Sequence, residues 1–151
     1  MKRIYVVICL AFGSVGLYAQ TPVEDLIDKY RKSSGASCVS LSGFELTLAR
    51  PDLQASPIGP VASDVQKLMV LHMDSTASSV RDSFEKNLYG TLGAYERYGQ
   101  HKSSNGMVEI YAKFSDEDHV SELVIFNPNL WILNDIHGYF SLASLEKLEK
   151  E

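Results

Sequence analysis

Residues 119–148 read HVSELVIFNPNLWILNDIHGYFSLASLEKL, and this stretch decides the expected fold. Residues 119–126 are rich in β-branched and aromatic side chains, which favour a strand. The following Asn127-Pro128-Asn129 predicts a turn, because proline cannot donate a ladder hydrogen bond and asparagine tolerates turn dihedrals. Residues 130–137 are a second apolar run, after which Gly138 loosens the backbone and Ser141 can cap a helix. The stretch therefore predicts strand, turn, strand and closing helix.

Strands are also expected immediately upstream. Asn105-Gly106 is a strong hairpin signal, since this pair accepts the positive φ values of a tight turn, and it separates the strands expected at 94–101 and 107–114. Strands joined by tight turns must be antiparallel. Residues 66–74, QKLMVLHMD, carry apolar side chains on both faces, which predicts a strand in the centre of its sheet.

Two helices are expected near the start of the folded region. Thr21 and Glu24 have the spacing of a capping box, with a proline between them at the first helical position. Residues 43–50 predict a short helix with Phe44 and Leu48 on one side.

The remaining elements complete an α+β pattern. Residues 36–41 alternate weakly and predict a strand, Pro51 is expected to end the short helix, and residues 52–63 have no clear period and predict a long loop. Residues 78–88 predict a helix of about three turns. The expected fold is a two-layer α+β sandwich, with a mostly antiparallel sheet of five to six strands and helices packed on one face.

The first 19 residues have the pattern of a cleaved signal peptide. A basic start at Lys2-Arg3 precedes an apolar run over residues 4–17, and Ala19 is a small residue suited to cleavage. An uncleaved anchor is disfavoured because no stop-transfer charges follow. We therefore expect export to the periplasm or outer envelope, residues 20–151 as one domain, and no transmembrane segment after cleavage.

Charge and cysteine content narrow the class of partner. Removal of residues 1–19 takes away Lys2 and Arg3, so the net charge falls from −5 to −7. An acidic surface disfavours binding to nucleic acid or to anionic lipid. Cys38 is then the single cysteine, either a free redox thiol or a small buried side chain, and an intrachain disulfide is impossible.

Candidate functional residues are few. His72 with Asp74, and Asp135 with His137, are pairs spaced two residues apart, so each pair shares one face of its strand. The two pairs could form one His/Asp site if their strands were neighbours; the alternative is solvated or hydrogen-bonded side chains. Trp131 could be an exposed anchor for a partner or a residue of the core.

Signatures of catalysis or of metal binding are missing from the sequence. The histidines show no HxxxH or HxH spacing, CxxC does not occur, and neither a Gly-x-Ser-x-Gly motif nor a phosphate-binding glycine loop is present. We therefore expect no metal, no cofactor and no enzymatic activity.

Several segments resemble a known family. Val120-Ser121-Glu122-Leu123-Val124 and Gly138-Tyr139-Phe140-Ser141-Leu142 are similar to the signature of a Bacteroidetes family of exported proteins, domain of unknown function 4252. The resemblance covers most of residues 23–148, although Asn134 and Asp135 stand where such proteins have more apolar residues. It implies an exported single domain with a link to envelope stress signalling.

The expected function is that of a non-enzymatic binding or interaction domain, whose partner is another envelope protein. Small antiparallel sheets with helices on one face leave the other face free for such contacts. Two alternatives stay open. One is a metal- or thiol-dependent periplasmic enzyme that uses His72, His137 or Cys38, and the other is a structural subunit that self-assembles.

Overall fold

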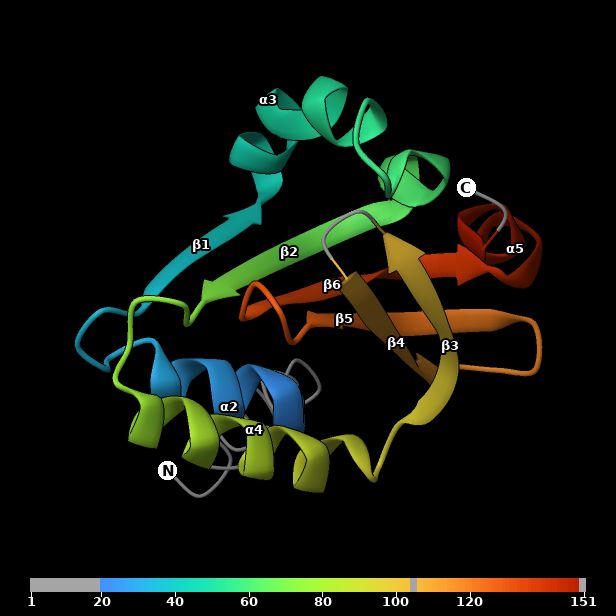
Figure 1. Ribbon diagram of the computed structural model, residues 1–151. Helices are drawn as coiled ribbons and strands as arrows, with labels where there is room; N and C mark the ends of the chain where they lie inside the picture. The colour runs from blue at the N-terminus through green and yellow to red at the C-terminus, as the bar shows by residue number, and fades with distance from the viewer. Residues whose placement is uncertain (1–19, 104–105, 150–151) are drawn as a thin grey trace, which may run out of the picture.

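The computed structural model describes residues 20–103 and 106–149, and within them six strands form one antiparallel sheet of order β1-β2-β6-β5-β4-β3 (Figure 1). The signal peptide predicted at residues 1–19 lies outside the described residues. The strands are β1 (Ser37–Ser42), β2 (Val65–His72), β3 (Glu96–Ser103), β4 (Gly106–Phe114), β5 (His119–Asn127) and β6 (Ile132–Ser141). The α+β class and the antiparallel sheet are confirmed.

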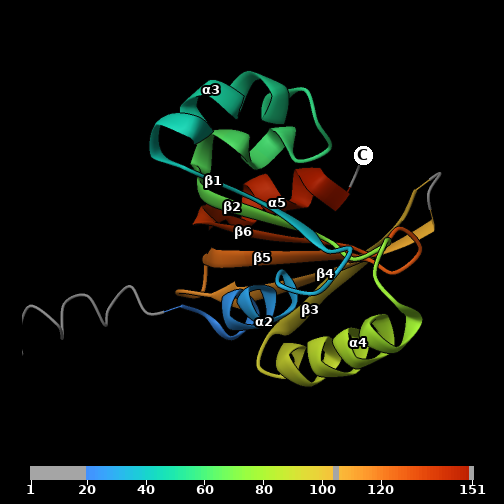
Figure 2. The ribbon, with the colours of Figure 1, turned by 90° about the vertical axis from the view of Figure 1, so that its left-hand side faces the viewer.

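Helices cover both faces of the sheet (Figure 2). Face A, the face of Met69 and Leu133, is covered by α2 (Pro22–Tyr30) and α4 (Ser78–Leu92). Face B, the face of Leu68 and Ile136, is covered in part by α3 (Gly43–Gln54), the 3₁₀ helix η1 (Gly59–Asp64) and α5 (Leu142–Glu149). The expectation of helices on one face was wrong, because the central strands are apolar on both sides.

A capping box and a row of aromatic rings fix α2 and α4 on face A. Thr21 Oγ1 accepts a hydrogen bond from the Glu24 amide and the Glu24 carboxylate accepts from the Thr21 amide, so the predicted capping box is confirmed. Aromatic rings then link the helices to the sheet: Tyr30 contacts Phe84 edge-on, and Phe84 contacts Phe126. Edge-to-face contacts of this kind add to the stabilisation from burial.

Helix α3 does not pack through the side that carries Phe44 and Leu48. Leu46 is its buried residue, whereas Phe44 and Leu48 are 75% and 65% exposed. Pro51 lies inside the helix and does not end it. Part of the segment expected to be a loop is η1, and the Arg50 guanidinium donates to the carbonyls of Ala62 and Val65, which ties α3 to η1 and β2.

The stretch that predicted the fold adopts the expected order of β5, turn, β6 and α5. Gly138 has a different role from a flexible break. A Cβ at this position would overlap the backbone oxygen of Asp64 and contact the Phe140 ring, so the close approach of two chain segments requires glycine. Ser103 pairs with Gly106 across β3 and β4, as the predicted hairpin requires, and Asn105 lies outside the described residues.

Within the part of the chain that the structure covers, no helix is both long enough and apolar enough to cross a bilayer.

Candidate functional site

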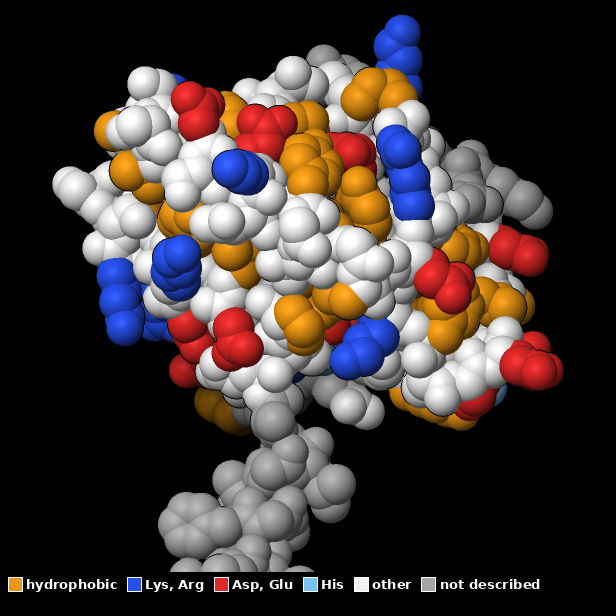
Figure 3. All heavy atoms as spheres, turned by 90° about the horizontal axis from the view of Figure 1, so that it is seen from below, with side chains coloured by type: hydrophobic (Ala, Val, Ile, Leu, Met, Phe, Trp, Pro, Cys, Tyr) orange, Lys and Arg blue, Asp and Glu red, His pale blue; other side chains and the backbone are white. Residues whose placement is uncertain are grey.

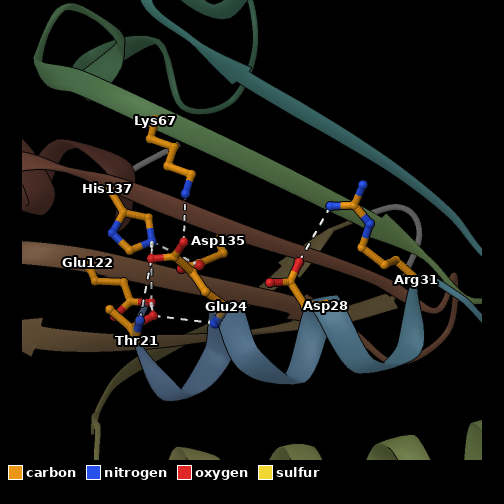
Figure 4. Close-up of polar contacts among 8 residues, drawn as sticks. All are labelled: Thr21, Glu24, Asp28, Arg31, Lys67, Glu122, Asp135 and His137. Carbon is orange, nitrogen blue, oxygen red and sulfur yellow. Dashed lines mark hydrogen bonds and ion pairs between the residues drawn. The ribbon is translucent and has the colours of Figure 1, made fainter. Parts of the chain in front are cut away.

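A group of charged side chains lies on face A, beside the N-terminus of α2 (Figure 4). Lys67 of β2 is paired with His137 of β6, and His137 is paired with Glu122 of β5. Asp135 lies two residues from His137 on the same face, and Glu24 reaches the group from the first turn of α2. We call these five residues the polar cluster.

The polar cluster is closely connected around the imidazole of His137. Its Nε2 lies 2.9 Å from Asp135 Oδ2, 3.3 Å from Glu24 Oε1 and 3.6 Å from Glu122 Oε1. Lys67 Nζ lies 2.6 Å from the second oxygen of Glu24. Three carboxylates therefore converge on one ring nitrogen, with a single ammonium at the edge.

Glu122 is held by two hydroxyl groups from other elements. Thr21 Oγ1 donates to Glu122 Oε1 at 2.7 Å, and Tyr95, just before β3, donates to Oε2 at 2.8 Å. The side chain of Glu122 is 1% exposed and that of Asp135 is fully buried. Hydrogen bonds of this kind are needed to keep polar groups inside a protein.

Burial controls the protonation of the polar cluster. The pKa of Glu122 is raised to about 8, mainly by burial and in part by the neighbouring Asp135, while the hydrogen bonds from Thr21 and Tyr95 oppose the shift. Burial also raises the pKa of Asp135, with the Glu24 charge acting in the same direction. Burial lowers the pKa of His137, against the pull of Glu122 and Glu24. Such perturbed values are typical of functional sites, although structural networks show them too.

The Asp135 carboxylate carries an unpaired atom. Its Oδ2 contacts His137, whereas Oδ1 is buried and receives no hydrogen bond from any described residue. Oxygen atoms of Glu24 and Asp135 and a ring nitrogen of His137 all lie within 4.8 Å of one another. A buried carboxylate surrounded by other acids requires a shared proton or a cation.

The structure separates the two predicted His/Asp pairs. Asp135 and His137 do share a face and are in contact. His72 is on β2, which does neighbour β6, but it is paired with Ile132 and lies five positions from Lys67, hence on face B. Asp74 follows the end of β2 and is exposed. The possibility that both pairs form one site is therefore not realised, because His72 and His137 lie on opposite faces of the sheet.

Trp131 and Cys38 lie away from the polar cluster. Trp131 adopts a positive φ of 55° in the turn between β5 and β6, and its ring packs on Phe126 and beneath Arg81. Cys38 is a free, partly buried thiol in β1. Burial raises its pKa, which opposes the thiolate form that a nucleophile needs.

Sequence reasoning missed Glu24, Lys67 and Glu122 as members of a site. Glu24 was identified only as a helix cap, and Glu122 only as part of a family signature. The sequence carried one signal for Glu122. It lies on the same face of β5 as Val124 and Phe126, which are buried, and acidic residues are rarely buried. Lys67 offered no such signal.

A second candidate site is a cavity of about 720 Å³ on face B. The strands β2 to β6 form its floor, and the segment joining α3 to η1 forms a wall together with Leu148 of α5. The lining residues are Leu53, Ser56, Pro57, Ile58, Leu68, Val70, His101, Val108, Ile110, Ile125, Asn127, Ile132, Asn134, Ile136 and Leu148. The cavity is therefore mainly aliphatic.

The polarity of the cavity differs from that of the outer surface over face A. No Asp, Glu, Lys or Arg is among the described residues that line it, and its polar groups are Ser56, His101, Asn127 and Asn134. The surface seen from the side of α2 and α4 instead carries acidic and basic side chains interspersed (Figure 3). The cavity thus combines an apolar body with a few polar groups, none of them a carboxylate, an ammonium or a guanidinium.

Comparison with family models, curated proteins and solved structures finds no match to this chain. The resemblance to domain of unknown function 4252 stays a prediction.

Proposed function

We propose that the protein is an exported, non-enzymatic binding domain of the bacterial envelope that holds an uncharged, mainly apolar small molecule in the face B cavity. The single observation that carries this proposal is the aliphatic cavity itself. Its volume of about 720 Å³ falls within the range of small-molecule sites, roughly 300–1,000 Å³, which are mostly apolar with a few polar groups.

The lining favours a ligand without charge. Transfer of a charged group into an apolar site is costly unless a counter-charge pairs with it, and the described lining residues supply no carboxylate, ammonium or guanidinium. Asn127 and Asn134 lie on adjacent strands. The Asn134 amide can donate to or accept from one polar end of a ligand, and the Asn127 amide nitrogen can donate to it, since Asn127 Oδ1 already accepts from the amides of Asn129 and Leu130. An acyl chain with a neutral polar head has this chemistry.

The concave shape favours a small molecule over the protein partner expected from the sequence. Part of face B is enclosed by the α3–η1 segment and by α5, so the sheet is not an open platform. A bound molecule would contact the strands on one side and Ile58 or Leu148 on the other.

Binding of the neutral fluorophore N-phenyl-1-naphthylamine to the purified chain tests the proposal. We expect saturable binding at one site. Val70→Trp fills the cavity and should abolish binding, and Asn134→Asp adds a charge at nearly constant shape and should weaken it about tenfold, since burial of an unpaired charge is unfavourable. Leu48→Trp, at an exposed position of α3, is the matched control and should bind as the parent does.

Two outcomes would overturn the proposal. One is non-saturable binding, or binding that Val70→Trp leaves unchanged while the variant unfolds at the parental temperature. The other is capture of an envelope protein by a photo-cross-linker at position 125 with no co-purified apolar molecule detected by native mass spectrometry. That result would assign the cavity to a protein segment.

A further inference from the structure

The polar cluster on face A holds three carboxyl groups around one imidazole, with one lysine ammonium beside them. Glu24, Glu122 and Asp135 are carboxylates with exposed fractions of 7%, 1% and 0%, and Lys67 contacts only the first of them. Buried carboxylates are stable when paired or when they coordinate metal ions. Oδ1 of Asp135 is buried and receives no hydrogen bond from a donor group among the described residues, so either a proton shared with Glu122 or a bound cation must satisfy it.

The spacing of the ligand atoms matches the first coordination shell of one ion. Zn²⁺ binds His nitrogen and carboxylate oxygen at about 2.0–2.2 Å, so two neighbouring ligand atoms lie roughly 2.8–3.5 Å apart. The observed distances from His137 Nε2 are 2.9 Å to Asp135 Oδ2 and 3.3 Å to Glu24 Oε1. A direct hydrogen bond accounts for one such distance, whereas several carboxylates around one nitrogen suit an ion at their centre.

We propose that Glu24, Asp135 and His137 form a binding site for a divalent transition-metal ion, with Zn²⁺ as the favoured occupant. One imidazole with carboxylates is a mixed nitrogen and oxygen set, which suits Zn²⁺ better than Mg²⁺ or Ca²⁺. Glu122 Oε1 lies 3.6 Å from His137 Nε2, and Thr21 orients it toward the same point, so it is available as a fourth ligand. The site joins the first turn of α2 to β6.

The positive charge of Lys67 opposes binding of the metal ion. Its ammonium lies 2.6 Å from Glu24 Oε2, on the carboxylate whose other oxygen faces His137. Two cations so close together repel each other. Loss of the Lys67 charge should therefore strengthen metal binding, which is the opposite of what general damage to the fold would do.

The experiment is a titration of the untagged, chelator-treated chain with Zn²⁺, followed by calorimetry and by the thermal unfolding temperature. We expect one ion per chain, and a rise in unfolding temperature because the ion binds only the folded state. His137→Ala should abolish both effects. His72→Ala and Asp74→Asn alter the other His/Asp pair with the same spacing, and should leave both unchanged.

Lys67→Met keeps the proposal testable if His137→Ala fails to fold. This variant should bind Zn²⁺ about tenfold more tightly than the parent chain, because the nearby positive charge is gone. Absence of calorimetric binding at 100 µM Zn²⁺, equal losses in His72→Ala and His137→Ala, or unchanged affinity in Lys67→Met would each overturn the proposal.

Discussion

Lys67 and His137 are directly paired across β2 and β6, and their side chains reach opposite oxygens of the same carboxylate, Glu24. The start of α2 is thereby joined to two central strands through one side chain. Both contacts lie at the edge of a buried acidic group, since Lys67 is 36% exposed and Glu24 only 7%. Glu24 therefore takes part both in the capping box of α2 and in the contacts to the paired residues Lys67 and His137.

Replacement of Lys67 by methionine should destabilise the metal-free protein. The loss leaves Glu24 buried without its cation, and we expect the free energy of unfolding to fall by about 1–2 kcal/mol, less than for a fully buried pair because Lys67 is partly solvated. Arg31→Met removes the exposed pair with Asp28 and should cost less than about 0.5 kcal/mol. Urea unfolding with chelator present measures both, and equal losses would contradict the prediction.

Stability should fall as the pH rises from about 5 to 8. The pKa of Glu122 is raised from 4.5 to about 8 in the folded state, so its stabilising protonation is complete below the unfolded value and is lost as pH rises through the folded one. One proton contributes a slope of at most about 1.4 kcal/mol per pH unit. The charged or titratable groups around Glu122 are Glu24, Lys67, Tyr95, Lys113, Asp135 and His137.

Glu122→Gln isolates this effect, because glutamine keeps the size of the side chain and cannot titrate. In chelator-treated protein, its unfolding free energy should vary less with pH between 5 and 8 than that of the parent. Parallel profiles for the two proteins would show that Glu122 is already ionised in the folded state.

Helix α3 offers a direct test of which of its leucines supports the fold. Leu46 is 2% exposed and Leu48 is 65% exposed. Leu46→Ala should lower the unfolding free energy by about 2–4 kcal/mol through lost burial and a residual cavity, and Leu48→Ala should change it by less than about 0.5 kcal/mol. The opposite ranking would contradict the burial of Leu46.

Gly138 should be intolerant of a side chain. In Gly138→Ala the new methyl group meets the Asp64 carbonyl, which is backbone and cannot rotate away, so we expect a loss of about 1–3 kcal/mol. Gly90→Ala is the control, because its Cβ would meet nothing within 4 Å and alanine favours a helix. This variant should be neutral or more stable by up to about 1 kcal/mol, and thermal unfolding compares the two.

Much of the fold could be predicted because local patterns encode it. The capping box at Thr21, the hairpin near Gly106 and the apolar runs on either side of Pro128 each specify a neighbouring element, and short turns make the strands antiparallel. The layers could not be predicted in the same way. Phe44 and Leu48 have the spacing of a buried face, yet tertiary packing on η1 and β1 selects Leu46 instead.

Most members of the polar cluster could not be predicted from the sequence. The contact between Thr21 and Glu122 joins residues 101 positions apart, and no local spacing signals it. Only the pair of Asp135 and His137 was visible, since a separation of two on a strand places both side chains on one face. The apolar cavity was equally hidden, because it depends on where α5 and the α3–η1 segment cross the sheet.

The row of Lys67, His137, Glu122 and Lys113 across four neighbouring strands has a consequence for folding accuracy. Antiparallel apolar strands can pair in several offsets of similar hydrophobic energy. A slip of β6 by one residue would turn His137 and Asp135 into the aliphatic layer around Leu123 and bring Ile136 among the acids. A one-residue slip would therefore bury charges without partners, so this row of polar residues favours the native register over that slip.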